Sequence, residues 1–111
     1  MKVIVTGGRY YNGGGIVSAE LSKLNPSLVI EGGATGADYF AKMWAGANEV
    51  ESKTYYADWS LHGSAAGPIR NKKMIDENLD AVLLVFPGGK GTADCRRYAE
   101  KMGLKIIEAQ K

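Results

Sequence analysis

The 111-residue sequence predicts a single α/β domain over residues 1–111, a Rossmann-like three-layer fold with an open parallel sheet of about five strands. Two observations carry this prediction. Apolar strand-like runs alternate with helix-like runs along the chain, a pattern typical of parallel sheets covered on both faces. In addition, three glycine-rich segments each follow a strand-like run and precede a helix-like run: residues 6–9, 31–38 and 86–92.

The first elements form a predicted βαβ unit. Residues 2–6 are a short β-branched run that ends at paired glycines, and the run at residues 28–30 ends in the same way. Both are typical of buried parallel strands. Between them, residues 16–24 place apolar side chains along one side of a helix, which Asn25 and Pro26 terminate.

The middle of the chain is more polar. Residues 38–47 predict a helix because apolar side chains recur there at helical spacing, and residues 52–56 predict a strand at the sheet edge. Residues 57–68 resemble a loop. Residues 70–78 can form a helix, with Pro68 suitably placed near its start.

The last third holds the most apolar run of the sequence, residues 81–86, which we expect at the centre of the sheet. A helix over 92–102 and a strand over 104–108 follow. The predicted strand order is 3-2-1-4-5, which places the first and fourth strands together at the topological switch point. Open α/β sheets bind ligands there, beyond the carboxyl ends of their strands. Two glycine-rich loops should therefore flank one crevice.

Composition restricts the class of protein. A hydrophobic content of 45% and a charged content of 23% are near the averages of soluble globular domains, which disfavours disordered, collagen-like and membrane classes. No apolar run approaches the ~20 residues that span a bilayer, and Met1 and Lys2 lead into a strand without a signal-peptide pattern. We expect a cytoplasmic protein with no membrane partner.

The sequence contains one cysteine, Cys95, and one histidine, His62. It therefore predicts no intrachain disulfide and no metal site, and no cofactor is predicted. The net charge of +2 is too small to indicate nucleic acid by itself, but it is compatible with an anionic ligand.

The glycine-rich loops predict a phosphate site, because glycine allows backbone N–H groups to approach an anion and a following helix N-terminus adds favourable dipole charge. The segment at 87–92 has neither the Walker A spacing nor Gly-x-Gly-x-x-Gly, so an ordinary ATPase or dinucleotide dehydrogenase is disfavoured. A tight turn with a good N-cap is the alternative. The candidate ligand-binding residues of the first and last loops are Gly7, Gly8, Arg9, Pro87, Gly88, Gly89, Lys90, Gly91 and Thr92.

Two arginines are candidate anion ligands. Arg9 follows the first strand and can bind a phosphate through two parallel hydrogen bonds, although a solvated surface arginine is the alternative. Arg70 and Asn71 can offer a guanidinium and an amide at a helix start, whereas their structural alternative is a capped surface helix. We favour a functional role for Arg70.

The second loop contributes Gly32 and Gly33 as ligand-binding candidates and two carboxylates. Asp38 either caps backbone donors of its helix or contacts a ribose and takes part in acid–base chemistry. Glu31 ends a strand beside the crevice, where it can accept from ribose hydroxyls or act as a general base.

Three further residues have two interpretations each. Trp59 either stacks on a base or packs, and Trp44 is assigned to the core. Cys95 is placed in the first turn of the last helix, where the dipole could create a nucleophile. Because the sequence places no histidine beside it, we favour a small, buried or inert Cys95.

Five ordered blocks of this chain resemble the YspA-related, cpYpsA-like branch of the SLOG superfamily of Rossmann-like proteins, whose members are often encoded by phages or bacteria. The blocks are Val-Thr-Gly-Gly-Arg at 5–9, the loop 31–38, Ala-Asp-Trp at 57–59, residues 66–71 and residues 86–92. They cover nearly the whole chain. The resemblance implies a site for nucleotides or nucleotide derivatives, without a reaction firmly attached to it.

A more distant resemblance is to the Lonely-guy phosphoribohydrolases, with the motif Pro-Gly-Gly-x-Gly-Thr-x-x-Glu. Residues 87–92 match its first part and Arg70 with Met74 matches an upstream Arg-x-x-x-Met, but Cys95 stands where the motif has glutamate. The resemblance therefore implies one half of a catalytic Arg/Glu pair. Glu31 or Asp38 would have to replace the missing carboxylate.

These observations leave three functions open and do not decide whether the protein is an enzyme. The first is a module that binds a phosphorylated nucleotide or nucleotide-sugar derivative. The second is a phosphoribohydrolase that cleaves the N-glycosidic bond of a nucleoside monophosphate, with Arg70, Glu31 and Asp38 as catalytic candidates. The third is single-stranded nucleic-acid binding, as in the similar DNA-processing protein of transformation, ranked last because 14 basic residues face 12 acidic ones. The resemblance also implies a homo-oligomer, with a dimer favoured.

Overall fold

The computed structural model describes residues 1–109. Its sheet has five strands, all parallel, in the order β3-β2-β1-β4-β5, which confirms the predicted fold class and strand order. The register pairs Thr6 with Val85, so β1 and β4 end side by side. The strands are β1 (Lys2–Thr6), β2 (Leu28–Glu31), β3 (Glu51–Thr54), β4 (Val82–Val85) and β5 (Lys105–Glu108).

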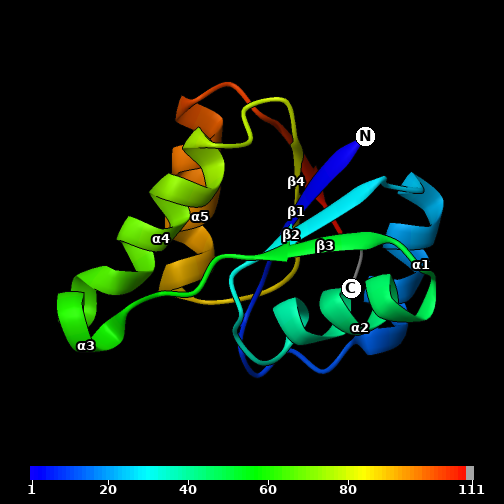
Figure 1. Cartoon of the computed structure of the whole chain (residues 1–111), viewed down its shortest axis with the longest axis horizontal. Coiled ribbons are helices and arrows are strands. Elements are labelled where there is room, and N and C mark those ends of the chain that lie inside the picture. Colours follow the sequence, from blue (N-terminus) through cyan, green and yellow to red (C-terminus); the bar gives the residue numbers. More distant parts are fainter. Residues whose placement is uncertain (110–111) are drawn as a thin grey trace.

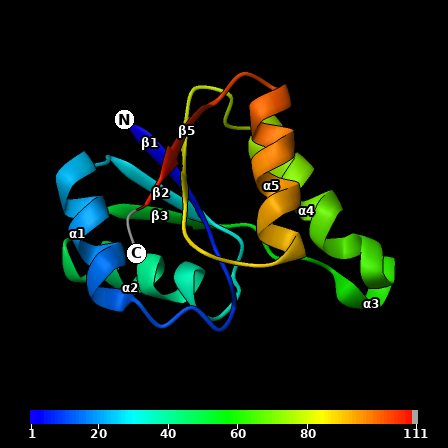
Figure 2. The ribbon, with the colours of Figure 1, turned by 180° about the vertical axis from the view of Figure 1, so that it is seen from behind.

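The helices cover the two faces of the sheet separately. Figure 1 shows α1 (Gly14–Leu24) and α2 (Ala37–Ala47) on one side of the strands, with α4 (Ala66–Asp76) and α5 (Lys90–Lys101) on the other. The view from behind in Figure 2 shows the same separation, with the short α3 (Trp59–His62) beyond the start of α4. None of the helices in residues 1–109 is long and apolar enough to cross a membrane.

Three details of the predicted elements were wrong. Residues 57–68 are not a simple loop, because they contain α3, a 3-10 turn at Gly63–Ala65 and the first turn of α4. The Asp58 carboxylate accepts a hydrogen bond from the Leu61 amide over 3.1 Å, which caps α3. The strand β4 is interior but not central, since β1 is the middle strand. Cys95 lies in the second turn of α5 rather than the first.

Alternation along the strands builds two cores. Val3 and Val5 of β1 pack with α1 and α2, whereas Ile4 between them packs with Met74 and Ile75 of α4 on the opposite face. These side chains are all buried, as expected for a strand with helices on both faces. Trp44 belongs to the first core, as predicted, and its indole N–H donates to the Ser22 hydroxyl over 3.1 Å.

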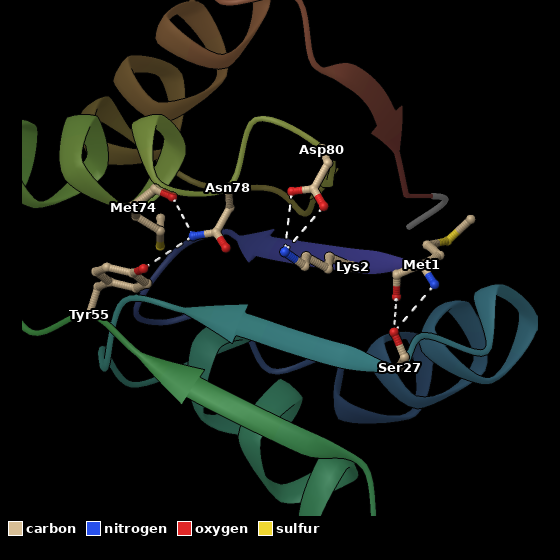
Figure 3. A network of polar contacts seen from close by, with 7 residues as sticks. All are labelled: Met1, Lys2, Ser27, Tyr55, Met74, Asn78 and Asp80. Atoms are coloured by element: carbon tan, nitrogen blue, oxygen red, sulfur yellow. Dashed lines mark hydrogen bonds and ion pairs between the residues drawn. The ribbon is translucent and has the colours of Figure 1, made fainter.

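Polar contacts join segments on both sides of β1 (Figure 3). The Asn78 side-chain amide is buried and donates to the Met74 carbonyl over 2.8 Å and to the Tyr55 hydroxyl over 3.2 Å. Lys2 pairs with Asp80 at 3.1 Å on the surface.

Candidate functional site

A cavity of about 650 Å³ lies beyond the carboxyl ends of β1 and β4. The loop after β1 and the loop after β4 form two of its walls, and Arg70 and Asn71 of α4 complete it. This is the topological switch point of the sheet. The lining residues are Thr6, Gly7, Gly8, Arg9, Tyr10, Tyr11, Asn12, Ala34, Arg70, Asn71, Pro87, Gly88, Gly89, Lys90, Gly91 and Thr92.

The two glycine-rich walls are in direct contact. The Gly8 amide donates to the Pro87 carbonyl over 2.8 Å. A Cβ at Gly88 would lie 2.1 Å from the Thr92 hydroxyl oxygen and 2.7 Å from the Gly8 nitrogen, so only glycine permits this approach. The Gly8 carbonyl in turn accepts from the Ala37 amide over 3.3 Å, which links the loop after β2 to the same assembly.

The charge of the cavity has one sign. Arg9, Arg70 and Lys90 line it, and no aspartate or glutamate among residues 1–109 does so. The helix α5 begins at the cavity, and no side chain in the described part of the chain caps its first turn. Its N-terminal amide groups and positive dipole end therefore add to the positive charge of the three side chains.

Arg70 is held in place by neighbours on three segments. Its Nη1 donates to the Gly32 carbonyl, and also to the Tyr55 carbonyl at 3.4 Å. Its Nε donates to Asn71 Oδ1 over 2.8 Å. The Asn71 amide donates to Asp94 Oδ2 over 3.1 Å and to the Gly91 carbonyl over 3.3 Å. The guanidinium is thus oriented before any ligand arrives.

Sequence reasoning missed Asp94. Its carboxylate approaches the Arg70–Asn71 pair because it precedes Cys95 on α5, and α4 and α5 pack side by side. Its position next to the residue that replaces the motif glutamate was the available signal.

Glu31 and Asp38 lie beneath the loop after β2 and do not line the cavity. Asp38 Oδ2 accepts from the amides of Gly32 at 3.2 Å and Ala34 at 3.3 Å. Glu31 accepts from the Gly33 amide over 2.6 Å and from the Thr54 hydroxyl. Burial raises the pKa of the Asp38 carboxyl from 3.8 to about 6. Both carboxylates organise the loop that holds Gly32 against Arg70.

A second hollow of about 370 Å³ adjoins the cavity, and Gly32 and Gly33 line this hollow instead. Arg9, Ala34 and Arg70 line both spaces, so the two lie side by side. The other residues of the hollow are Thr35, Tyr56, Ala57 and Trp59.

The segment directly after Arg9 was also missed by sequence reasoning. Tyr10, Tyr11 and Asn12 line the cavity. The Tyr11 ring lies 5.5 Å from the Phe86 ring, and its buried hydroxyl has no hydrogen-bond partner among residues 1–109. Their adjacency to the Val-Thr-Gly-Gly-Arg block was the only signal in the sequence.

Cys95 is fully buried in the core between α5 and the sheet. Burial raises the pKa of its thiol to about 11, so the thiolate is disfavoured at neutral pH. This arrangement agrees with the small, inert residue rather than the nucleophile. Among residues 1–109, no three His, Cys, Asp or Glu side chains form a group that could hold a metal ion.

Comparisons with known proteins agree with this architecture. The model of the YspA, cpYpsA-related SLOG family matches residues 1–62. The Gene 61 protein of Mycobacterium phage D29 is 36% identical over 118 residues, which span 96% of this chain and 94% of the relative. The solved structure of DNA processing protein A from Streptococcus pneumoniae shares the fold at 16% identity and a TM-score of 0.56. That match covers 96% of this chain but 58% of the other.

Proposed function

The chain belongs to the YspA, cpYpsA-related SLOG family, and on this premise we propose that it binds a phosphorylated nucleotide or nucleotide-sugar derivative. The phosphate groups would occupy the 650 Å³ cavity, on the loops 7–9 and 88–92. Gly7, Gly8, Gly88 and Gly89 would supply a close backbone surface, and Thr92 a hydroxyl.

The single observation that carries the proposal is the charge of the cavity. Arg9, Arg70 and Lys90 line it without a carboxylate from the described residues, at the uncapped start of α5. Clustered like charges repel one another, and a bound phosphate would relieve that repulsion while accepting hydrogen bonds from guanidinium and amide groups. Arg70 is already oriented by Gly32 and Asn71, which lowers the entropic cost of binding.

Isothermal titration calorimetry with pyrophosphate and with ADP tests this proposal. Arg9→Ala is the informative variant, because Arg9 is exposed whereas Arg70 also holds the loop after β2. Losing one charge-assisted contact should weaken binding of both compounds roughly ten-fold or more. Lys101→Ala, at an exposed position at the far end of α5 outside the cavity, removes the same charge as a matched control.

Two outcomes would count against the proposal. One is the absence of heat with pyrophosphate, ADP and a wider panel of cyclic dinucleotides and ADP-ribose derivatives. The other is an equal loss of affinity in Lys101→Ala, which would show that net charge alone causes the effect. Salt-sensitive binding of a single-stranded oligonucleotide without competition by pyrophosphate would instead favour the nucleic-acid function.

The second candidate function is N-glycosidic cleavage of a nucleoside monophosphate. Asp94 favours it, because its carboxylate accepts from the Asn71 side-chain nitrogen over 3.1 Å while the oxygen of the same side chain accepts from Arg70, although Asp94 does not line the cavity. Among the predicted catalytic residues Arg70, Glu31 and Asp38, the raised pKa of Asp38 suits acid–base chemistry, although neither buried carboxylate lines the cavity.

Release of free base from the common nucleoside monophosphates, followed by chromatography, tests this candidate. Asp94→Asn should then abolish base release while ADP still binds. No base after long incubation of the wild-type protein would dispose of the hydrolase.

We also propose a homodimer through α2. Tyr39 and Met43 lie one helical turn apart and are 52% and 55% exposed. Light scattering coupled to gel filtration should give twice the mass of one chain, and Met43→Lys should return it to the monomer. A monomeric wild-type protein at high concentration would contradict the proposal.

A further inference from the structure

The hollow beside the phosphate cavity exposes two aromatic side chains. Tyr56 is 69% exposed and Trp59 is 52% exposed, although both face the same space as Arg9 and Arg70. Exposed rings that meet at one hollow mark binding surfaces more often than isolated surface residues do. The fold does not need these rings for its core, since neither belongs to the buried clusters.

Each ring is supported from one side. The Tyr56 ring lies against the backbone at Gly33, where an added Cβ would come within 2.7 Å of Cδ1. The Trp59 indole lies over Gly67 of α4, where an added Cβ would meet Cη2 at an ordinary contact distance of 3.4 Å. Trp59 starts α3, which lies beyond the start of α4 (Figures 1 and 2), and no residue of this short helix is buried. The rings are therefore positioned by glycines while much of their surface stays open.

The hollow and the cavity share their charged residues. Arg9 and Arg70 line both, so a ligand that reaches from one space to the other passes beside these two residues. The hollow contains no carboxylate from the described residues, and its Thr35 hydroxyl already donates to the Arg9 carbonyl over 2.8 Å. Beside the two arginines and the Tyr56 hydroxyl, the recognition that this hollow offers is therefore planar stacking on its exposed rings.

From this arrangement we propose that the hollow is a base subsite, and that the ligand class is a nucleoside diphosphate or a longer derivative whose base stacks on Trp59. The inference rests on the proposed function, because it needs the phosphates in the adjoining cavity. In this binding mode the ribose lies between the base in the hollow and the phosphates in the cavity, next to Arg9 and Arg70. Purines are preferred to pyrimidines, since the larger ring system covers more of the indole.

The test compares ADP with pyrophosphate, which carries the phosphates without the base. Stacking on Trp59 should make ADP bind roughly ten-fold more tightly than pyrophosphate, and UDP should gain less. Trp59→Ala should reduce ADP to the affinity of pyrophosphate and leave pyrophosphate binding unchanged. Leu61→Ala is the matched control, because Leu61 is 71% exposed on the same short helix and does not line the hollow.

Fluorescence provides an independent readout. The chain has two tryptophans, and Trp44 is buried in the core at 8% exposure. ADP should quench the emission of the wild-type protein, pyrophosphate should not, and Trp59→Phe should leave only the unresponsive Trp44 signal.

The outcomes separate the two proposals. Equal affinities for ADP and pyrophosphate, both unaffected by Trp59→Ala, would overturn the base subsite and leave the phosphate cavity standing. Failure of both compounds to bind would overturn the proposed function itself. A loss of ADP binding in Leu61→Ala as large as in Trp59→Ala would show that disturbance of α3, not stacking, is responsible.

Discussion

The amide of Gly8 donates a hydrogen bond to the carbonyl of Pro87 over 2.8 Å, two residues beyond the last paired residues of β1 and β4. Phe86 donates to the Thr6 carbonyl over 2.9 Å just before it, so backbone pairing continues past both strands. The loops after β1 and β4 are therefore hydrogen-bonded to each other where they line the cavity. Because the two loops are so close, a side-chain atom added at Gly88 would collide with the Gly8 backbone.

Gly88→Ala should destabilise the protein and abolish pyrophosphate binding. The new methyl would come within 2.7 Å of the Gly8 nitrogen, which is backbone and cannot move aside freely. We expect a loss of about 1–3 kcal/mol in the free energy of unfolding, measured by urea denaturation. Gly46→Ala is the control, because Gly46 does not line the cavity, a Cβ there meets nothing within 4 Å, and helix α2 should gain about 0.5 kcal/mol. Equal stability of Gly88→Ala and the wild type would contradict the packing argument.

Because of Asp38, the free energy of unfolding should fall as the pH rises from about 4 to about 6. Its pKa is raised from 3.8 to about 6 by burial, and Glu31 raises it further while Arg70 and two backbone amides lower it. Because the folded protein binds this proton more tightly than the unfolded chain does, the favourable contribution is complete below pH 4. This contribution is lost by about pH 6, which lowers the free energy of unfolding by roughly 3 kcal/mol.

Urea denaturation of the wild type and Asp38→Asn at several pH values between 4 and 7 measures this effect. Surface carboxylates with lowered pKa, such as Asp58 and Asp76, act in the opposite direction in both proteins, so the difference between the two curves isolates Asp38. The difference in the free energy of unfolding between the wild type and Asp38→Asn should shrink towards pH 4, where the wild-type carboxyl is protonated and uncharged like the asparagine. A difference that does not change with pH would show that the Asp38 pKa is not raised.

Cys95 should react with a disulfide reagent only when the protein unfolds. Its side chain is fully buried and burial raises its pKa to about 11, so both access and thiolate fraction are low. At pH 8 we expect labelling roughly 1,000-fold slower than in denaturing urea, because it must wait for rare opening. Rapid stoichiometric labelling of protein with an unchanged circular dichroism spectrum would restore the nucleophile as a candidate.

Asn78→Ala should destabilise the fold without changing ligand affinity. The substitution removes the buried amide that bonds to the Met74 carbonyl and the Tyr55 hydroxyl (Figure 3). A loss of about 1–3 kcal/mol in the free energy of unfolding is expected, since buried polar groups lose partners. Asp80→Ala breaks the exposed pair with Lys2 and should have little effect. Similar losses in both variants would refute the special role of the buried amide.

Helix and strand positions were largely predictable because they depend on local patterns. A β-branched run that ends at paired glycines identified β1, and helical spacing placed Trp44 on the core side of α2. The region 57–68 was the exception. Its short helix is stabilised by a capping contact of Asp58 and carries no apolar periodicity for a pattern to reveal.

In the candidate site, too, the sequence predicted some features and not others. Of the predicted ligand-binding residues, those on the loops after β1 and β4 line the cavity together with Arg70 and Asn71, whereas Gly32 and Gly33 line the neighbouring hollow and Asp38 lies beneath it. Motif order indicated which loops would meet. It did not indicate which side chains would be buried, or that Asp94 would reach Asn71.

By itself the sequence determined the order of strands and helices, the switch point between β1 and β4 and the glycines that gather there, because periodicity and turn chemistry are local properties. Only the tertiary structure decided that Arg9, Arg70 and Lys90 share one cavity, that Trp59 joins it through a second hollow, and that Glu31 and Asp38 are buried. Those relationships depend on distances and burial between segments far apart in the chain, and it is burial that sets the protonation of Asp38 and Cys95.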